Sequence, residues 1–192
     1  MTQPVRPVVV AVVGSPRRRS NTAALVAAAL EELEAAGAAC ETISLRDLTI
    51  APCLAHSTCG DLAACVLKDD AEAVLARMYV ADCLVLGTPV YYENVSAQLK
   101  ALMDRNLNRF YREERLRAKA VGLIAVTGET GLQDALDAMR RYVALSSVGE
   151  MPVHTCGGCA SDEGEAAGDE ALLAGARAMG RALAGDLGLT PV

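Results

Sequence analysis

VVVAVVGSPRRRSNT, the sequence of residues 8–22, decides the fold class of this chain. Its opening run is apolar and mostly β-branched without polar alternation, which is typical of a parallel strand covered by helices on both faces. A glycine then turns the chain, and a helical pattern with one apolar face runs from Thr22 to about Ala36, before Gly37. The stretch therefore predicts a strand, a turn and a helix in succession.

The same unit recurs along the chain. The apolar runs are Val8–Val13, Cys40–Leu45, Cys83–Gly87, Ala120–Val126 and Met151–Thr155. Further helical patterns cover Val95–Asn106, Leu132–Val143 and Leu172–Leu187. Because serial strand–helix units use right-handed crossovers, their helices cover both faces of a parallel sheet. We expect one flavodoxin-like α/β domain over residues 1–192, with a five-stranded parallel sheet in the order 2-1-3-4-5.

Composition excludes several classes of function. The chain has 18 basic and 24 acidic side chains and a net charge of −6, which argues against nucleic acid as the main partner. No apolar run approaches the ~20 residues that cross a bilayer, so no membrane partner is expected. Residues 1–4 carry no signal-peptide pattern, which predicts a cytoplasmic location and cysteines that are mostly thiols. The locally basic stretch 105–119 also contains Glu113 and Glu114, which favours a solvated helix face.

Ligands of open parallel sheets bind at the carboxyl ends of the strands, beside the point where the strand order reverses. We therefore expect the loops 14–22, 88–96 and 127–131 to meet. The first loop has neither the lysine of a Walker loop nor a G-x-G-x-x-G fingerprint. Hydroxyl, amide and guanidinium groups at a helix N-terminus can instead enclose one phosphomonoester, here from Ser15, Arg17, Ser20, Asn21 and Thr22. The alternative is that Ser20 or Asn21 only caps the helix. Arg18 and Arg19 are expected to face solvent.

The second loop belongs to GTPVYYENVSAQLKALMDR, residues 87–105. Pro89 fixes the direction of the chain, and Val90, Tyr91 and Tyr92 offer apolar, flat surfaces at the end of a strand. Such surfaces favour a planar ligand. Glu93 and Asn94 then lead into a helix that Asn94 is expected to cap.

The two motifs together resemble the NAD(P)H-dependent FMN reductases, a flavodoxin-like family that includes quinone and azo reductases. The resemblance implies non-covalent FMN, NAD(P)H as co-substrate, and a homodimer or homotetramer with the flavin near the subunit interface. It implies reduction of a small acceptor, such as a flavin, a quinone, or a nitro or azo compound. Because the cofactor carries this chemistry, no catalytic side chain is assigned. Residues 107–117 and 156–166 are expected to shape the acceptor pocket, although neither contains a recognisable motif.

Site residues follow from the resemblance by position. The phosphate would contact the five residues of the first loop named above. The isoalloxazine would lie against Pro89, Val90, Tyr91, Tyr92, Glu93 and Asn94, and the loop containing Thr127 and Gly128 would meet its other side or the ribityl chain. Family members often carry glycine where Glu93 and Glu129 stand. These two carboxylates would oppose the charge of a reduced flavin, unless they face solvent or a partner subunit.

The cysteines suggest an iron–sulfur cluster as an alternative cofactor. An iron–sulfur branch of the family carries a compact cysteine cluster followed by two aspartates, and this chain has Cys53, Cys59 and Cys65 before Asp69-Asp70. Neighbouring cysteines are separated by five residues and only three occur here, whereas a [4Fe–4S] cluster takes four thiolates. We therefore predict no metal site, unless Cys156, Cys159 or a partner subunit completes a cluster.

The pair Cys156 and Cys159 is either a redox dithiol, half of a zinc site, or two incidental thiols. Neither His56 nor His154 has an obvious carboxylate partner. An electron carrier between proteins and a non-catalytic flavin-binding module remain alternatives to the reductase.

Overall fold

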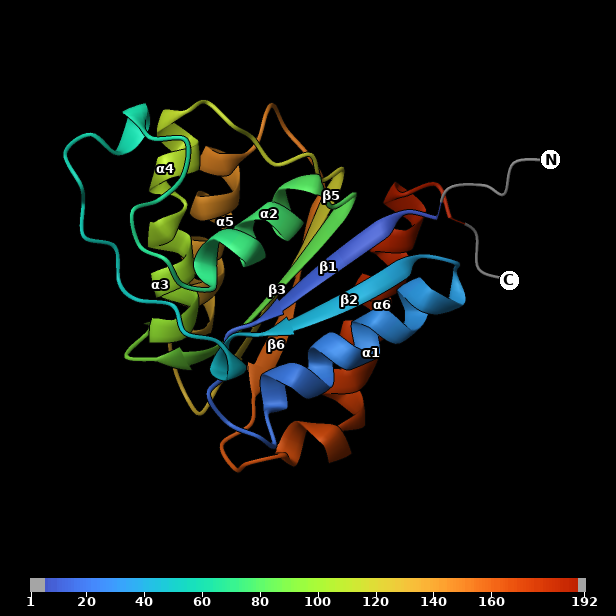
Figure 1. The fold of residues 1–192 in the computed structure, drawn as a ribbon. Coiled ribbons are helices and arrows are strands. Elements are labelled where there is room, and N and C mark those ends of the chain that lie inside the picture. Colours follow the sequence, from blue (N-terminus) through green and yellow to red (C-terminus); the bar gives the residue numbers. More distant parts are fainter. Residues whose placement is uncertain (1–5, 190–192) are drawn as a thin grey trace.

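The computed structural model describes residues 6–189, so residues 1–4 lie outside the described part of the chain. A parallel sheet has the strand order β2-β1-β3-β5-β6, which is the predicted order 2-1-3-4-5 (Figure 1). Its strands are β1 (Val8–Val13), β2 (Ala39–Ser44), β3 (Cys83–Tyr91), β5 (Ala120–Thr127) and β6 (Val153–Cys159). The prediction of five strands misses one: the two-residue β4 (Asn94–Val95) pairs antiparallel with the end of β3.

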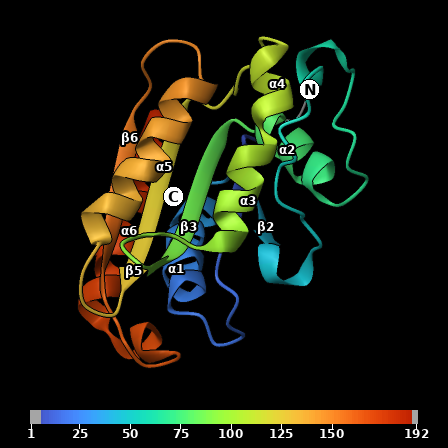
Figure 2. The same ribbon diagram turned by 90° about the vertical axis from the view of Figure 1, so that its left-hand side faces the viewer.

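Helices cover both faces of the sheet (Figure 2). On one face lie α1 (Asn21–Ala35) and α6 (Glu170–Asp186), and on the other lie α2 (Ala71–Val80), α3 (Ala97–Arg105), α4 (Leu107–Tyr111) and α5 (Leu132–Ser146). Short 3₁₀ turns occur at Leu45–Asp47, Cys59–Asp61 and Glu165–Gly168. Within the described part of the chain, no helix has the length and apolar character that a bilayer crossing needs.

The burial of both faces of the central strands explains why their sequences do not alternate between apolar and polar residues. In β3, Leu84 and Leu86 pack with the α2, α3 and α5 side, whereas Cys83 and Val85 pack with the α1 and α6 side. All four are 0% exposed. Both faces of the strand are therefore core, as the continuous apolar run predicts.

Several predicted boundaries are wrong, including that of β3, which ends at Tyr91 rather than Gly87, and two of the differences have local reasons. Ser96, not Asn94, caps α3, because its hydroxyl accepts a hydrogen bond from the Leu99 amide at 3.2 Å. The last strand ends at Cys159 rather than Thr155. Glycines 157 and 158 allow this extension, since a Cβ on Gly157 would lie 1.9 Å from the carbonyl oxygen of Ala125 in β5. Helix α2 was not predicted at all.

Candidate functional site

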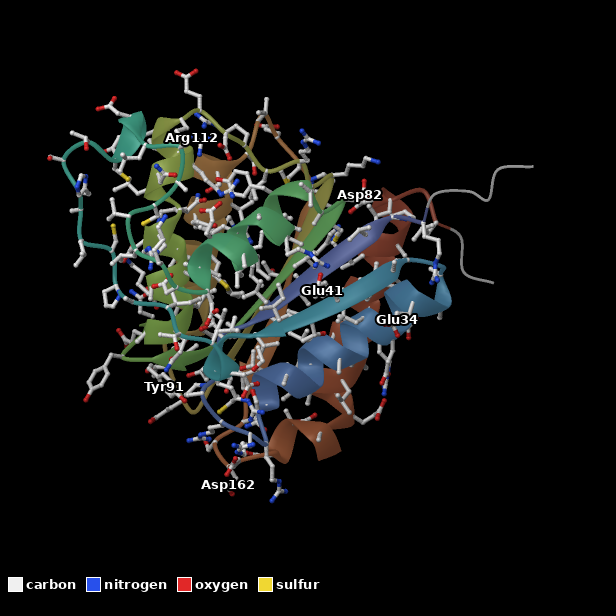
Figure 3. The ribbon with its side chains drawn as sticks, in the orientation of Figure 1. Glu34, Glu41, Asp82, Tyr91, Arg112 and Asp162 are labelled. Atoms are coloured by element: carbon white, nitrogen blue, oxygen red, sulfur yellow. The ribbon has the colours of Figure 1, made fainter. Side chains whose placement is uncertain are left out.

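The three predicted loops meet at the carboxyl ends of β1, β3 and β5. They line a cavity of about 250 Å³ together with a fourth segment; its lining is Ser15, Arg17, Asn21, Thr22, Pro89, Val90, Tyr91, Val126, Gly128, Ala160 and Ser161. A second cavity of about 460 Å³ shares Val90 and Gly128 and adds Tyr92, Glu93, Thr127, Glu129 and Thr130. Figure 3 shows Tyr91 and Asp162 at this same end of the molecule. Among the predicted site residues, Ser20 and Asn94 alone line neither cavity.

Ser96 joins the first motif to the second. Its hydroxyl donates to the carbonyl of Gly14 at 2.6 Å, and the Gly14 amide donates to the carbonyl of Gly87 at 2.8 Å. A Cβ on Gly14 would lie 2.9 Å from the Cβ of Leu99, so the turn after β1 needs glycine for this close approach. The turn after β1 is thus held against the residues that begin α3.

The end of the cavity at α1 suits an anion. Helix α1 has 15 residues, and its first amides lack partners within the helix. Ser20 caps it, since its hydroxyl accepts from the Ala23 amide at 3.1 Å. Ser15 and Thr22 are buried beside this turn, and the exposed Arg17 lines the cavity. The arrangement offers hydroxyls, amides and one guanidinium to a single anionic group.

The side chain of Asn21 does not cap α1 but forms hydrogen bonds with the loop after β6. Its side-chain amide donates to the carbonyls of Ala160 and Asp162, at 3.1 and 2.8 Å, and its oxygen accepts from the Ala166 amide at 3.1 Å. Asn21 therefore ties the loop after β6 against the first turn of α1. That loop supplies Ala160 and Ser161 to the first cavity, and no residue of 156–166 lines the second. Residues 107–117 line neither cavity, so their expected role in the acceptor pocket is not supported by position.

The second motif forms a hairpin rather than an open loop. Tyr92 and Glu93 sit between β3 and β4 with φ angles of 48° and 58°, in the left-handed region that favours glycine. Loop 127–131 packs directly on this turn, because a Cβ on Gly131 would lie 2.5 Å from the Cα of Glu93. Tyr92 is fully exposed, and Tyr91 is 39% exposed. The hairpin thus presents both tyrosines at the mouth of the cavities.

Comparison with known proteins assigns the family. The family described as NADPH-dependent FMN reductase matches residues 7–157. The chain belongs to this family. FMN is the cofactor of the FMN reductase family, with NAD(P)H as co-substrate, so the resemblance predicted from the two motifs is confirmed.

Several relatives of this FMN reductase family member are named iron–sulfur flavoproteins. An iron–sulfur flavoprotein of Methanocaldococcus jannaschii is 41% identical over 118 residues, which are 62% of this chain and 61% of that protein. One of Archaeoglobus fulgidus is 34% identical over 163 residues, 85% of this chain and 73% of that protein. The alignment thus spans less than two thirds of the first relative.

Solved structures with low identity share the fold. An NAD(P)H:quinone oxidoreductase from Methanothermobacter marburgensis is 21% identical with a TM-score of 0.71, over 93% of this chain and 98% of that chain. An NADH:FMN oxidoreductase is 23% identical with a TM-score of 0.68, over 97% and 91%. These likenesses establish the flavodoxin-like fold.

The residues present fit FMN. A phosphomonoester suits the hydroxyls, amides and guanidinium at the start of α1. The apolar wall of Pro89, Val90 and Tyr91 adjoins that anion end in the same cavity, and the second cavity continues from it past Gly128. A flat ring joined to a phosphate by a polar chain matches this succession of surfaces.

An iron–sulfur cluster, which the relatives' names imply, does not fit. Cys53 lines an apolar cavity of about 330 Å³, and Cys59 lines an adjoining cavity of about 490 Å³ that shares Ala55 and Leu107 with the first. The thiol of Cys65 instead accepts a hydrogen bond from Arg105 at 3.4 Å. Among residues 6–189, no three His, Cys, Asp or Glu side chains converge as metal ligands.

The structure favours two incidental thiols among the alternatives for Cys156 and Cys159, whereas the expectation for His154 is wrong. Cys156 and Cys159 lie three residues apart within β6, so their side chains point to opposite faces and do not form a dithiol. Burial raises the pKa of Cys156 to about 11, whereas the exposed Cys159 donates to the carbonyl of Gly128 at 2.8 Å. His154 does have a carboxylate partner, since its Nε2 lies 2.6 Å from Asp186 on the packed α6.

Proposed function

We propose that this chain binds FMN in the two joined cavities and takes hydride from NAD(P)H to reduce a small acceptor. The observation that carries the proposal is the continuity of an anion-binding helix end with an apolar wall and an open second cavity. Family membership supports the cofactor and the co-substrate. The acceptor is a flavin, a quinone, or another small oxidant such as a nitro or azo compound.

The residues predicted to bind the phosphate have two different roles. Ser15, Arg17 and Thr22 would contact the phosphate, since they line the cavity beside the unpaired amides of α1. Ser20 and Asn21 already use their polar groups on the Ala23 amide and on the loop after β6. We therefore assign these two residues to building the site rather than to holding the phosphate.

The ring end combines apolar surface with backbone polar groups. Pro89, Val90 and Tyr91 would support one face of the isoalloxazine, and backbone groups of the hairpin and of loop 127–131 would face its polar edge. Glu93 and Glu129 line the second cavity, and none of residues 6–189 that line it is a lysine, arginine or histidine. The carboxylates would disfavour additional negative charge there.

When bound, FMN supplies the hydride-accepting and electron-donating chemistry. Pro89, Val90 and Tyr91 would orient the ring, and the side lined by Glu93 and Glu129 would stay open for the two substrates in turn. No side chain in the cavities is needed to hold or move a proton, so none is given a catalytic role.

The partners of the proposed reductase follow from the same family. We expect a homodimer or homotetramer, because the fully exposed Tyr92 projects beside the site and could meet a partner subunit. A cytoplasmic location fits the reduced state of the cysteines. Sedimentation of the FMN-loaded chain tests the oligomeric state.

Reconstitution and anaerobic reduction test the proposal. The purified chain should bind one FMN, and NADPH or NADH should bleach its visible absorbance in the absence of oxygen. Bound flavin that neither nucleotide bleaches would favour the electron carrier or the non-catalytic binding module. A chain that fails to bind FMN would refute the proposal. Stopped-flow reoxidation with a panel of flavin, quinone, nitro and azo acceptors would then identify the acceptor class.

A further inference from the structure

The loop between β2 and α2 is closed at its base by two aspartates. Asp70 accepts from the Thr49 amide at 2.7 Å, and the Asp70 amide donates to the Thr49 carbonyl at 3.1 Å. Asp69 accepts from the amides of Ala51 and Ala71, at 2.9 and 3.2 Å. The two ends of residues 51–70, which contain Cys53, Cys59 and Cys65, are therefore fixed side by side.

Arg105, at the end of α3, contacts both ends of this loop. The stretch 105–119 was predicted to be a solvated face, but the Arg105 side chain is 1% exposed. Its guanidinium donates to Asp69 at 2.6 Å and to the carbonyl of Ala51 at 3.0 Å through one nitrogen. The other nitrogen donates to the thiol of Cys65 and the carbonyl of Leu67, both at 3.4 Å. One side chain thus bonds both ends of the loop.

Arg105 and Asp69 each favour the charged form of the other. The hydrogen bond from Arg105 lowers the pKa of Asp69, although burial opposes this shift. Burial opposes the charge of Arg105 as well, but its hydrogen bonds to Asp69 and Cys65 raise its pKa. Both groups are therefore charged at neutral pH, and removing either one would leave a buried charge unpaired.

Two further side chains of the α3–α4 segment hold the middle of the loop. Asn108 is 2% exposed and donates to the carbonyls of Cys59 and Leu62, at 2.5 and 3.1 Å. Arg112 donates to the carbonyl of Ala63. The loop's carbonyls therefore point toward protein donors along its length.

A distant cysteine does not complete a cluster either. Cys156 packs with the core on the α1 and α6 side of the sheet, whereas Arg105 belongs to α3 on the opposite side. The thiol of Cys159 donates to Gly128 at the carboxyl edge of β5. Among the residues that the structure describes, neither Cys156 nor Cys159 thus supplies a fourth thiolate beside the three thiols of the loop.

We propose that the guanidinium of Arg105 organises the 51–70 loop in this chain, and that the chain holds no iron–sulfur cluster of the kind that its relatives' names describe. Arg105 cross-links the loop through Asp69, Cys65 and two carbonyls, so the loop is closed without metal. The proposal concerns metal content and loop order, and it stands independently of reductase activity.

Cluster content gives the first test. The full-length chain is incubated anaerobically with ferrous iron, sulfide and a thiol reductant, desalted, and analysed for iron and acid-labile sulfide. A variant with Cys53→Ser, Cys59→Ser and Cys65→Ser is the matched control. We expect both proteins to retain the same background of iron and sulfide. Cysteine-dependent retention of both elements, with broad visible absorbance that the variant lacks, would overturn the proposal.

Loop order gives the second test, by amide hydrogen exchange with mass-spectrometric detection. Arg105→Met should accelerate exchange of residues 51–70 by about tenfold or more, while residues 8–13 of the central β1 keep their protection. Lys119→Met, at a side chain that is 65% exposed, is the control and should change neither region. Asp69→Asn provides a milder second variant if Arg105→Met does not fold, and should also accelerate exchange of the loop. Unchanged exchange of residues 51–70 in the folded variants would show that Arg105 does not organise the loop.

Discussion

The carboxyl-edge site and the 51–70 loop are built in opposite ways. The site forms where short connections leave parallel strands, so the sheet itself brings residues 14–22, 88–96 and 127–131 together. The loop has one short 3₁₀ turn and depends on side chains from α3 and α4. Backbone topology therefore positions the first region, whereas a few buried polar side chains position the second.

This difference predicts that substitutions in the two regions change different properties of the protein. Substitutions at the edge site should change FMN affinity with little change in global stability. Substitutions in the loop's polar core should change stability with little change in FMN affinity, because Arg105 lines neither site cavity. The Arg105→Met prediction below measures both quantities, and the others measure the one that the substitution should change.

The largest expected effect is that of Arg105→Met on stability. The substitution leaves Asp69, whose side chain is 10% exposed, without its cation. Loss of one partner of a buried pair costs about 3–5 kcal/mol, which urea unfolding of the apo protein should report. FMN affinity of the folded fraction should change less than threefold. Lys119→Met is the control, expected to cost less than about 0.5 kcal/mol because its ion pair is exposed.

The acid dependence of unfolding checks the same pair. Because folding lowers the pKa of Asp69 below 3.8, the pair stabilises the protein fully above that pH and less as the pH falls through the lower, folded value. The stability gap between the wild type and Asp69→Asn should therefore be constant near neutrality and shrink below about pH 4. A gap that grows in acid would contradict the ion-pair assignment.

Much of the first region could be predicted from the sequence. Apolar runs without alternation give the buried strands, and the loops that follow them must share one edge of the sheet. The strand order and the convergence of the three loops are as predicted. The additional β4 and the Ser96 cap were missed, because Asn94 and Ser96 are both good capping residues and only the hairpin decides between them.

Much of the second region could not be predicted. The burial of Arg105 depends on carbonyls and a carboxylate far along the chain, and a local basic stretch gives no sign of them. In the first region, too, the hydrogen bond from Asn21 reaches Asp162, which is 141 residues away in the sequence. Long-range polar pairs carry no periodic signal, so a pattern of residue types describes them poorly.

The next largest effect is that of Arg17→Ala on FMN binding. Loss of a charge-assisted hydrogen bond to the phosphate should weaken affinity by about 1–3 kcal/mol, as measured by fluorescence titration of the apo protein. Arg18→Ala has the same change of charge, and Arg18 lines neither cavity. It should weaken binding less than threefold. Equal losses in both variants would mean that Arg17 acts only through general positive charge.

A smaller effect is expected for Glu93→Gly, and it has the opposite sign. Glu93 adopts a φ of 58°, which costs a residue with a Cβ about 1 kcal/mol relative to glycine. The variant should therefore unfold at higher urea concentration, with a gain of about 1 kcal/mol. Gly131→Ala is the converse control and should destabilise, because its φ is 78° and its Cβ would meet the Cα of Glu93. A destabilised Glu93→Gly variant would mean that the carboxylate makes a contact worth more than the strain.

The smallest effect concerns acceptor charge and depends on the proposed function. Glu93 and Glu129 line the open cavity without a basic residue, so an anionic acceptor should react more slowly than a neutral one of the same shape. The double variant Glu93→Gln and Glu129→Gln should raise kcat/KM for a sulfonated naphthoquinone, relative to the unsulfonated compound, by about threefold at low ionic strength. The gain should shrink markedly near 0.5 M salt, where the Debye length is about 4 Å. If FMN binds and NADPH reduces it, yet the ratio is the same in both proteins, then the carboxylates face away from the acceptor and the edge site selects by shape alone.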